Sequence, residues 1–367
     1  MSRKDFPVFY NAPVRSWDIL VIGGGIIGLS LARELRKRGA SVLVVERGEP
    51  GREASYAAGG MLVSCGDETP STLKPLATAS AQMYPEFAHE LEDESGEKVD
   101  LRSEGTLLFV EHSGDQFPHA EPLARPLAEL EPALEASGRM PVFLKERSVC
   151  PRALVHAAFK AARHRGVDIS TGTRVLSVDV AHGAAIGVTT DKTSYSAGKV
   201  VNCAGAWAGE IGLFPIPTRP VKGQMVCFAM PSRNLLRHVV RSPEIYLIPR
   251  SDGRLLAGAT VEEAGFDKRT VPETIQRLRR AAIAMLPALA EARVLEDWAG
   301  LRPGTPDDLP ILGATTVPGY FVATGHFRDG ILLTPVTASA MAQLIDTGKS
   351  EYDLGPFSVE RFALRAA

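Results

Sequence analysis

Cysteine is scarce in this chain, and its cysteines are widely spaced. The 367 residues include only 4 cysteines, none of them in a C-x-x-C pair: Cys65, Cys150, Cys203 and Cys227. This spacing predicts neither a disulfide framework nor a zinc ribbon, and it favours a reducing compartment. The 8 histidines include no pair four residues apart, so we expect no metalloprotease-type site and no bound metal.

An excess of charge of either sign is also lacking. There are 41 Lys and Arg against 43 Asp and Glu, a net charge of −2 at pH 7. Such a balance provides no long-range attraction to nucleic acid or to an anionic membrane surface. The most apolar stretch, residues 19–32, is interrupted by four glycines and is too short to cross a bilayer. The N-terminal segment has no apolar signal core, and these absences together predict a soluble, cytoplasmic protein.

The chain does contain a glycine-rich turn between a strand and a helix. Residues 18–22 (DILVI) have the apolar, β-branched pattern of a short buried strand. Gly23-x-Gly25-x-x-Gly28 follows directly, and residues 41–46 (SVLVVE) form a second apolar run. Because a helical crossover connects the two runs, we expect their strands to be parallel.

The intervening helix is expected to end at Gly39, with Ile27, Leu31 and Leu35 on its buried face. Its charged residues are expected to point largely outward: Arg33, Glu34, Arg36, Lys37 and Arg38.

In this context the glycines match a dinucleotide-binding turn. Gly23 permits the tight turn, Gly25 allows backbone to approach a pyrophosphate, and Gly28 allows close helix–strand packing. The helix N-terminus supplies N–H groups and the positive end of its dipole. Glu46 ends the second strand, where a carboxylate accepts hydrogen bonds from ribose hydroxyls. The motif predicts a bound dinucleotide and leaves NAD and FAD both open.

Later segments predict a second, different domain. Helical and strand patterns occupy residues 151–166, 173–180 and 199–203, whereas short β-like runs at 223–230, 245–249 and 254–260 indicate an antiparallel sheet. A helix near Pro272, a strand at 320–324 and a helix at about 330–345 complete the chain. The expected fold class is α/β with α+β, a Rossmann-like domain interleaved with an antiparallel-sheet substrate domain. The expected boundaries are 17–95, 146–218 and 306–350 for the first domain, 96–145 and 219–305 for the second, and 1–16 for an N-terminal extension.

Three segments favour a flavin over a nicotinamide. Residues 51–62 are rich in small side chains, which suit a loop lying against a flat ring system. Residues 200–205 (VVNCAG) read as a strand that ends in small residues. Residues 325–333 (GHFRDGILL) are expected to place a helix N-terminus where it stabilises negative charge on a reduced flavin.

These segments and four others resemble the D-amino-acid oxidase superfamily, and within it the glycine oxidases of the thiamine pathway. In order they are DILVIGGGIIG, REASYAAGGML, NCAGAWAG, VKGQ, IYLIPR, GLRPGTPDDLPILG and GHFRDGILL. The resemblance covers about residues 17–346. It implies noncovalent FAD in a domain of the GR2 type, and oxidative deamination of glycine and other small amines or D-amino acids by O₂. Hydride passes from the α-carbon to flavin N5, and the products are a 2-oxo acid such as glyoxylate, ammonia and hydrogen peroxide. Members are commonly homotetramers.

The resemblance also implies site residues. The flavin positions are Gly23, Gly25, Ile26, Ile27, Gly28, Glu46, Arg47, Ala54, Ser55, Gly59, Gly60, Met61, Val175, Ala204, Gly205, Trp207, His326, Phe327, Arg328, Asp329, Gly330, Ile331 and Leu332. The catalytic and substrate positions are Tyr246, Arg302 and Arg328. An arginine binds a carboxylate through two parallel hydrogen bonds, so Arg302 is the expected carboxylate clamp, with the Tyr246 hydroxyl as a second ligand.

Four residues depart from the family pattern. Tyr56 is expected to shift the flavin loop or narrow the pocket, and Val261 to reshape its wall. Glu244 either favours a basic substrate or points to solvent, and Asp329 adds negative charge near the ring. Alternatives therefore stay open: an oxidase of N-substituted glycines (sarcosine, iminodiacetate, N-carboxymethyl amines), or a flavin-fold binding protein without turnover. An NAD-dependent dehydrogenase leaves residues 325–330 unexplained.

Overall fold

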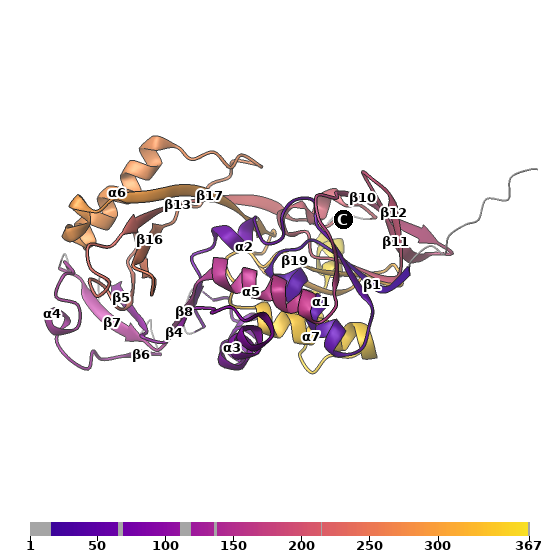
Figure 1. The fold of residues 1–367 in the computed structure, drawn as a ribbon, viewed down its shortest axis with the longest axis horizontal. Helices are drawn as coiled ribbons and strands as arrows, with labels where there is room; N and C mark the ends of the chain where they lie inside the picture. Colours follow the sequence, from indigo (N-terminus) through magenta and orange to yellow (C-terminus); the bar gives the residue numbers. More distant parts are fainter. Residues whose placement is uncertain (1–15, 65–68, 111–118, 136–137, 214, 366–367) are drawn as a thin grey trace, which may run out of the picture.

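Two eight-stranded sheets lie side by side along the longest axis of the molecule (Figure 1). This computed structural model describes residues 16–64, 69–110, 119–135, 138–213 and 215–365. The expected N-terminal extension lies outside the described residues except for Ser16, which begins the first strand. The expected domain boundaries stay a prediction, although the two sheets draw on different parts of the chain.

The first sheet is the predicted Rossmann-like one. Its order is β10-β11-β12-β1-β2-β9, with β19 paired to β12 and β18 paired to β19. The pairs β1–β2, β1–β12, β2–β9 and β12–β19 are all parallel, which confirms the expected crossover topology. The strands are β1 (Ser16–Ile22), β2 (Val42–Val45), β9 (Asp168–Ser170), β10 (Val175–Ala181), β11 (Ala184–Thr190), β12 (Ser194–Asn202), β18 (Ile311–Ala314) and β19 (Tyr320–Thr324).

Helices pack against this sheet and form the larger apolar core with it. Buried residues of four helices join those of β1, β2 and β19 in one cluster, and Figure 1 shows these helices close together near the middle of the molecule. They are α1 (Ile26–Lys37), α3 (Lys74–Ser95), α5 (Pro151–His164) and α7 (Thr334–Thr347). A short helix, α2 (Ala54–Ala57), interrupts the small-residue segment that was expected to be a loop.

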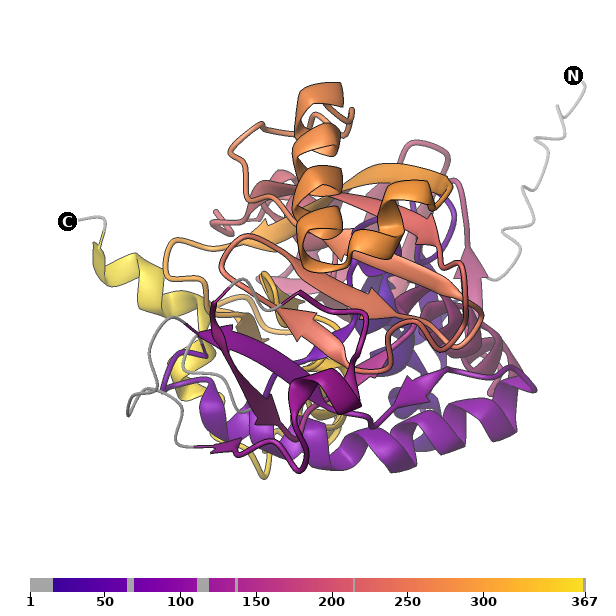
Figure 2. The ribbon, with the colours of Figure 1, turned by 90° about the vertical axis from the view of Figure 1, so that its left-hand side faces the viewer.

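The second sheet is mostly antiparallel, as predicted, in the order β17-β13-β16-β15-β14-β5-β7-β6. Helix α6 (Pro272–Met285) covers one face and shares a second apolar core with it, and Figure 2 shows this helix above the sheet. The strands are β5 (Thr106–Val110), β6 (Ala120–Glu121), β7 (Met140–Leu144), β13 (Arg219–Ala229), β14 (Val239–Arg241), β15 (Tyr246–Pro249), β16 (Arg254–Gly258) and β17 (Val294–Gly304).

Short elements complete the chain. A three-stranded sheet has the order β3-β8-β4. Its strands are β3 (Met61–Leu62), β4 (Leu101–Arg102) and β8 (Arg147–Val149). The short helices are α4 (Leu127–Leu130), η1 (Gly205–Glu210), η2 (Pro287–Glu291), η3 (Gly355–Phe357) and η4 (Val359–Arg365).

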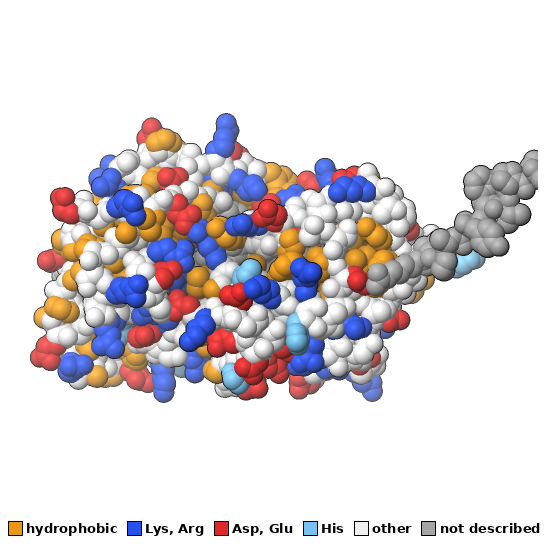
Figure 3. Space-filling model, in the orientation of Figure 1, with side chains coloured by type: hydrophobic (Ala, Val, Ile, Leu, Met, Phe, Trp, Pro, Cys, Tyr) orange, Lys and Arg blue, Asp and Glu red, His pale blue; other side chains and the backbone are white. Residues whose placement is uncertain are grey.

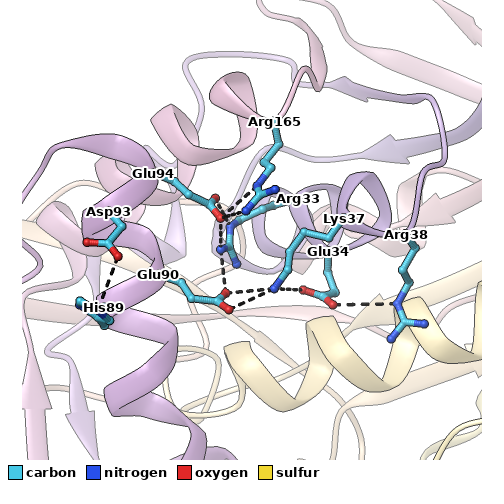
Figure 4. Close-up of polar contacts among 9 residues, drawn as sticks. All are labelled: Arg33, Glu34, Lys37, Arg38, His89, Glu90, Asp93, Glu94 and Arg165. Atoms are coloured by element: carbon cyan, nitrogen blue, oxygen red, sulfur yellow. Dashed lines mark hydrogen bonds and ion pairs between the residues drawn. The ribbon is translucent and has the colours of Figure 1, made fainter.

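One surface prediction is wrong: Arg33 of α1 is buried, with 2% of its surface exposed. Its guanidinium donates hydrogen bonds to Glu94 and Glu90 of α3 at 2.6 and 2.7 Å, and Arg165 also bonds Glu94 at 2.6 Å (Figure 4). Burial disfavours the charged form of Glu94, but the bonds from the two arginines outweigh it and lower its pKa to about 2. The long helix α3 therefore supplies counter-charges that the local pattern of α1 does not reveal.

The exposed surface agrees with the near-neutral net charge. Acidic and basic side chains are interspersed over the face drawn in Figure 3. Of the helices in the described ranges, none is both long enough and apolar enough to cross a membrane.

Candidate functional site

A cavity of about 580 Å³ is lined by residues from both large sheets. Its size is typical of a site that holds a small molecule or a cofactor. Of the residues expected to bind flavin or substrate, all but Gly28 and Leu332 line it. Gly28 does not line the cavity but allows α1 to pack closely on the turn, since a Cβ there would lie 2.0 Å from the Gly23 carbonyl oxygen. Leu332 lies in the core of the first sheet. The roles of the individual lining residues stay predictions.

The glycine turn forms one end of this cavity. Gly23 has φ +102°, a left-handed conformation, and a Cβ there would lie 2.6 Å from the carbonyl oxygen of Cys203. The first turn of α1 contains no acidic residue. The Ile26 N–H donates to Ser55 Oγ at 3.0 Å. The turn thus combines close backbone packing with a helix N-terminus whose dipole favours an anion.

Glu46 lies beside this turn and is buried. One carboxylate oxygen accepts a hydrogen bond from the Gly24 N–H and the other from the Gly48 N–H, each at 2.8 Å. A carboxylate oxygen has more than one acceptor site. Two backbone bonds therefore hold the carboxylate in place and leave acceptor capacity for ribose hydroxyls.

A segment from the substrate half, residues 261–271, reaches over the same end. Phe266 stacks on Trp207 with ring centroids 5.3 Å apart. The Arg47 guanidinium lies 3.6 Å from the centroid of the Trp207 ring. Arg47 also pairs with Glu53 at 2.8 Å, and Lys268 pairs with Glu53 at 3.1 Å. We call this segment the strap, because its Phe266 and Lys268 contact two cavity-lining residues, Trp207 and Glu53.

These features fit FAD. The N-terminus of α1 and the small residues beside it suit a pyrophosphate, the carboxylate of Glu46 suits a ribose, and the cavity continues from there to the antiparallel sheet. Glu46, Ser55 and the backbone of residues 23–26 would hold the dinucleotide, and residues 59–61 would lie against the ring system.

The opposite end of the cavity is built by one row of residues across the second sheet. In register, Met225 of β13 pairs with Gly258 of β16, Gly258 with Tyr246 of β15, and Tyr246 with Arg241 of β14. Directly opposite residues in a sheet share a face, so all four side-chain positions face the cavity that they line. Of these, only Tyr246 was predicted. The strand alternation is visible in the sequence, but the register that aligns the row is not.

Arg302 of β17 lies beside this row. Its guanidinium donates to the Thr260 carbonyl oxygen at 3.1 Å. Gly223 of β13 leaves the space that it occupies, since a Cβ there would lie 2.2 Å from Arg302 Nη1. Burial lowers the pKa of Arg302, and the like charge of Arg328 lowers it further. The two guanidinium groups repel each other, and a carboxylate bound near both would offset that repulsion.

The positive charges of Arg302 and Arg328 both act on the hydroxyl of Tyr246. Burial raises the pKa of its hydroxyl, and the charges of Arg302 and Arg328 oppose that rise without cancelling it. The hydroxyl therefore stays protonated at neutral pH and can donate a hydrogen bond to a carboxylate.

Residues 325–333 form turns, and the helix expected to begin at about residue 330 begins at Thr334. The expected helix N-terminus at the flavin ring is therefore displaced by one turn. Phe327 has φ +45°, and its N–H donates to the Pro303 carbonyl oxygen at 2.9 Å. Burial lowers the pKa of His326 to about 3, so this side chain is neutral, with Nε2 3.1 Å from Thr337 Oγ1.

The residues that depart from the family pattern have specific environments. The Tyr56 ring is not among the cavity-lining groups and packs under the Arg152 guanidinium at 4.0 Å, so it does not narrow the cavity. Glu244 lies before β15 at the cavity edge, where Arg139 pairs with it at 2.6 Å and lowers its pKa. The negative charge of Glu244 is thus compensated, which argues against a basic substrate. Val261 and Asp329 both line the cavity.

Residues 18–344 match the family model described as FAD dependent oxidoreductase. The glycine oxidase of Pseudomonas aeruginosa is 33% identical over 93% of this chain and 98% of its own length. The crystal structure of glycine oxidase from Geobacillus kaustophilus superimposes with a TM-score of 0.88 at 30% identity, covering 94% of this chain and 99% of that one.

A third relative is longer than this chain. The bifunctional protein ThiO/ThiG of Trichormus variabilis is 34% identical over 95% of this chain but only 56% of its own length. The chain thus spans about half the length of this relative.

Proposed function

The chain belongs to the family of FAD-dependent oxidoreductases and is of the glycine oxidase type, and from this premise we propose that it oxidises glycine and other small amino acids at the expense of O₂. The amine is oxidised to an imine by loss of a hydride and a proton, and water then releases glyoxylate, or another 2-oxo acid, and ammonia. O₂ takes up the two electrons and becomes hydrogen peroxide. A supply of product to thiamine biosynthesis is part of this proposal, supported by the name of the ThiO/ThiG relative.

The observation that carries the proposal is the convergence of Arg302, Arg328 and Tyr246 on one cavity. A small amino acid has one strong recognition group, its carboxylate, and Arg302 is placed to bind it through its planar fork. Tyr246, on β15 of the same sheet, donates a further hydrogen bond. Together these contacts fix the direction of the α-carbon, and positioning of this kind lowers a reaction barrier without any acid–base side chain.

The protein surroundings complete the site. FAD, when bound, supplies the two-electron acceptor. His326, held neutral by burial, adds no charge beside it. Met225, which is buried, and Gly258 line this end of the cavity, and such a wall would limit the access of water and so preserve the strength of the Arg302 contact.

A substrate panel tests the proposal. Purified protein should show flavin absorbance and release peroxide with glycine, sarcosine, D-alanine, D-proline or iminodiacetate. Glycine or D-alanine as the best substrate supports the proposal. Activity confined to sarcosine and iminodiacetate would assign the chain to N-substituted glycines instead, and no turnover of any amine by flavin-loaded protein would indicate a binding protein.

Arg302 is tested separately. Arg302→Lys keeps the charge but loses the bidentate fork, so it should lose most activity on glycine while retaining FAD. Unchanged kinetics would show that Arg302 does not bind the substrate carboxylate. The homotetramer and the cytoplasmic location expected by resemblance stay predictions, and light scattering on the purified protein measures the former.

A further inference from the structure

Arg250 is a buried cation that the proposed reaction does not use. It directly follows β15 in the IYLIPR segment, of which only Tyr246 has a proposed role. Its side chain is almost completely buried, with 2% of the residue exposed. An arginine stays charged in proteins, yet no carboxylate of the described ranges lies within the 4 Å that defines an ion pair with it.

Two backbone carbonyl oxygens accept hydrogen bonds from this guanidinium. Nη1 donates to the Val149 carbonyl oxygen at 2.9 Å, and Nη2 donates to the Gly59 carbonyl oxygen. The Val149 N–H in turn donates to the Gly60 carbonyl oxygen at 2.8 Å. The guanidinium thus joins β8 to the Gly59–Gly60 turn, and both glycines of that turn line the cavity.

The same turn is packed against the strand that carries Tyr246. A Cβ on Gly59 would lie 2.9 Å from Ile248 Cδ1 and 3.5 Å from the Tyr246 ring. Tyr246 begins β15 and Arg250 directly follows its last residue, so the bond from Arg250 to Gly59 ties the turn to the strand that carries Tyr246. Because a trans peptide is planar, fixing the Gly59 carbonyl also fixes the opposite direction of the Gly60 N–H.

Burying a charge is costly unless hydrogen bonds compensate it, and both compensating bonds of Arg250 go to backbone carbonyls, one of them on the cavity-lining Gly59. We propose, on the basis of the oxidase function above, that Arg250 is a positioning residue that holds the Gly59–Gly60 turn at a fixed distance from Tyr246. The flavin-binding loop and the carboxylate-binding residues are thereby kept in the alignment that the reaction needs.

The test compares Arg250→Met and Arg250→Lys with the wild-type holoenzyme. Arg254→Met is the matched control, because Arg254 lies on the next strand, is 30% exposed and pairs with Asp252 at 2.7 Å. The measurements are FAD affinity from flavin fluorescence, the visible flavin spectrum, melting temperature, and kcat and KM for glycine.

Arg250→Met should weaken FAD binding and lower kcat, each on the order of tenfold, as expected for loss of hydrogen bonds from a charged donor. KM should change little, because Arg302 and Tyr246 remain, and the flavin spectrum should shift. Arg250→Lys keeps a donor for one carbonyl and should recover part of both losses, whereas the control should match wild type.

The proposal is overturned if Arg250→Met lowers only the melting temperature, with FAD affinity, spectrum and kcat as in wild type. If that variant does not fold, Arg250→Lys decides by the same measurements. Should the wild-type protein oxidise no amine at all, the oxidase function fails, while FAD affinity and spectrum still decide the role of Arg250.

Discussion

Gly223→Ala offers the sharpest test of the carboxylate clamp, because it moves Arg302 without changing it. Gly223 does not adopt a left-handed φ, so alanine fits its backbone. The added Cβ would lie 2.2 Å from Arg302 Nη1, 2.4 Å from Nη2 and 2.6 Å from Cζ. All three atoms belong to the end of a flexible side chain, so the guanidinium moves and the strand stays.

The size of the effect follows from that overlap. Nη1 must retreat by about 1.2 Å, the difference between 2.2 Å and an ordinary contact at 3.4 Å. The bond to the Thr260 carbonyl oxygen, now 3.1 Å, is lost or redirected. Misplacement by about 1 Å costs up to about a hundredfold in rate. We therefore expect kcat/KM for glycine to fall by roughly tenfold to a hundredfold, or about 1.4 to 2.7 kcal/mol.

The assay is peroxide release as a function of glycine concentration, together with inhibition by acetate, which retains the carboxylate but lacks the amine. Both the KM for glycine and the inhibition constant for acetate should rise, while FAD affinity stays within about twofold of wild type. Gly212→Ala is the control, since a Cβ there meets no atom within 4 Å. Wild-type kcat/KM in Gly223→Ala would refute the reasoning that Arg302 holds the carboxylate.

Three further predictions concern the strap, His326 and the buried ion pairs. Phe266→Ala and Lys268→Ala remove the stack and the ion pair of the strap, so FAD should dissociate severalfold faster in a fluorescence assay. Arg269→Ala, at a side chain 87% exposed, should not change that rate. His326 has a native pKa of about 3 against an ordinary value of 6.5, so the unfolded state binds the extra proton between these values, and stability falls as the pH drops through 6.5. At pH 4.5 this loss amounts to roughly 3 kcal/mol, and urea unfolding of His326→Gln should show a correspondingly flatter pH dependence. Arg33→Ala removes charged hydrogen bonds to Glu90 and Glu94, which keep Lys37 and Arg165 as partners, and should lower the free energy of unfolding by about 1.5 to 3 kcal/mol; a loss below 1 kcal/mol would show that the network contributes little.

Local sequence determined the elements whose signals are contiguous. The glycine turn, the parallel strands around it and the strand at Tyr320–Thr324 all lie where their residue patterns place them. Turn chemistry and apolar runs act over a few residues, so no distant partner is needed to specify them. The same holds for the dinucleotide end of the cavity, which one β-α-β unit largely builds.

Helix α3 shows where local signals were insufficient. Its 22 residues include Pro85 inside the helix, and a proline argues against a helix in any local interpretation. Packing of Tyr84, Phe87 and Leu91 into the main core outweighs that cost. Because α3 also carries Glu90 and Glu94, the burial of Arg33 was decided there, some 60 residues away in the chain.

Which side chains meet at the substrate end of the cavity could be learned only from the tertiary structure. By itself, the sequence determined that a dinucleotide turn is present, and it predicted which arginines could bind a carboxylate. Strand register decided that Gly223 makes room for Arg302, that Arg241 and Tyr246 face the same cavity, and that Arg250 reaches Gly59. These contacts join residues from different strands, and a shift of one residue in any strand would turn its side chains to the opposite face.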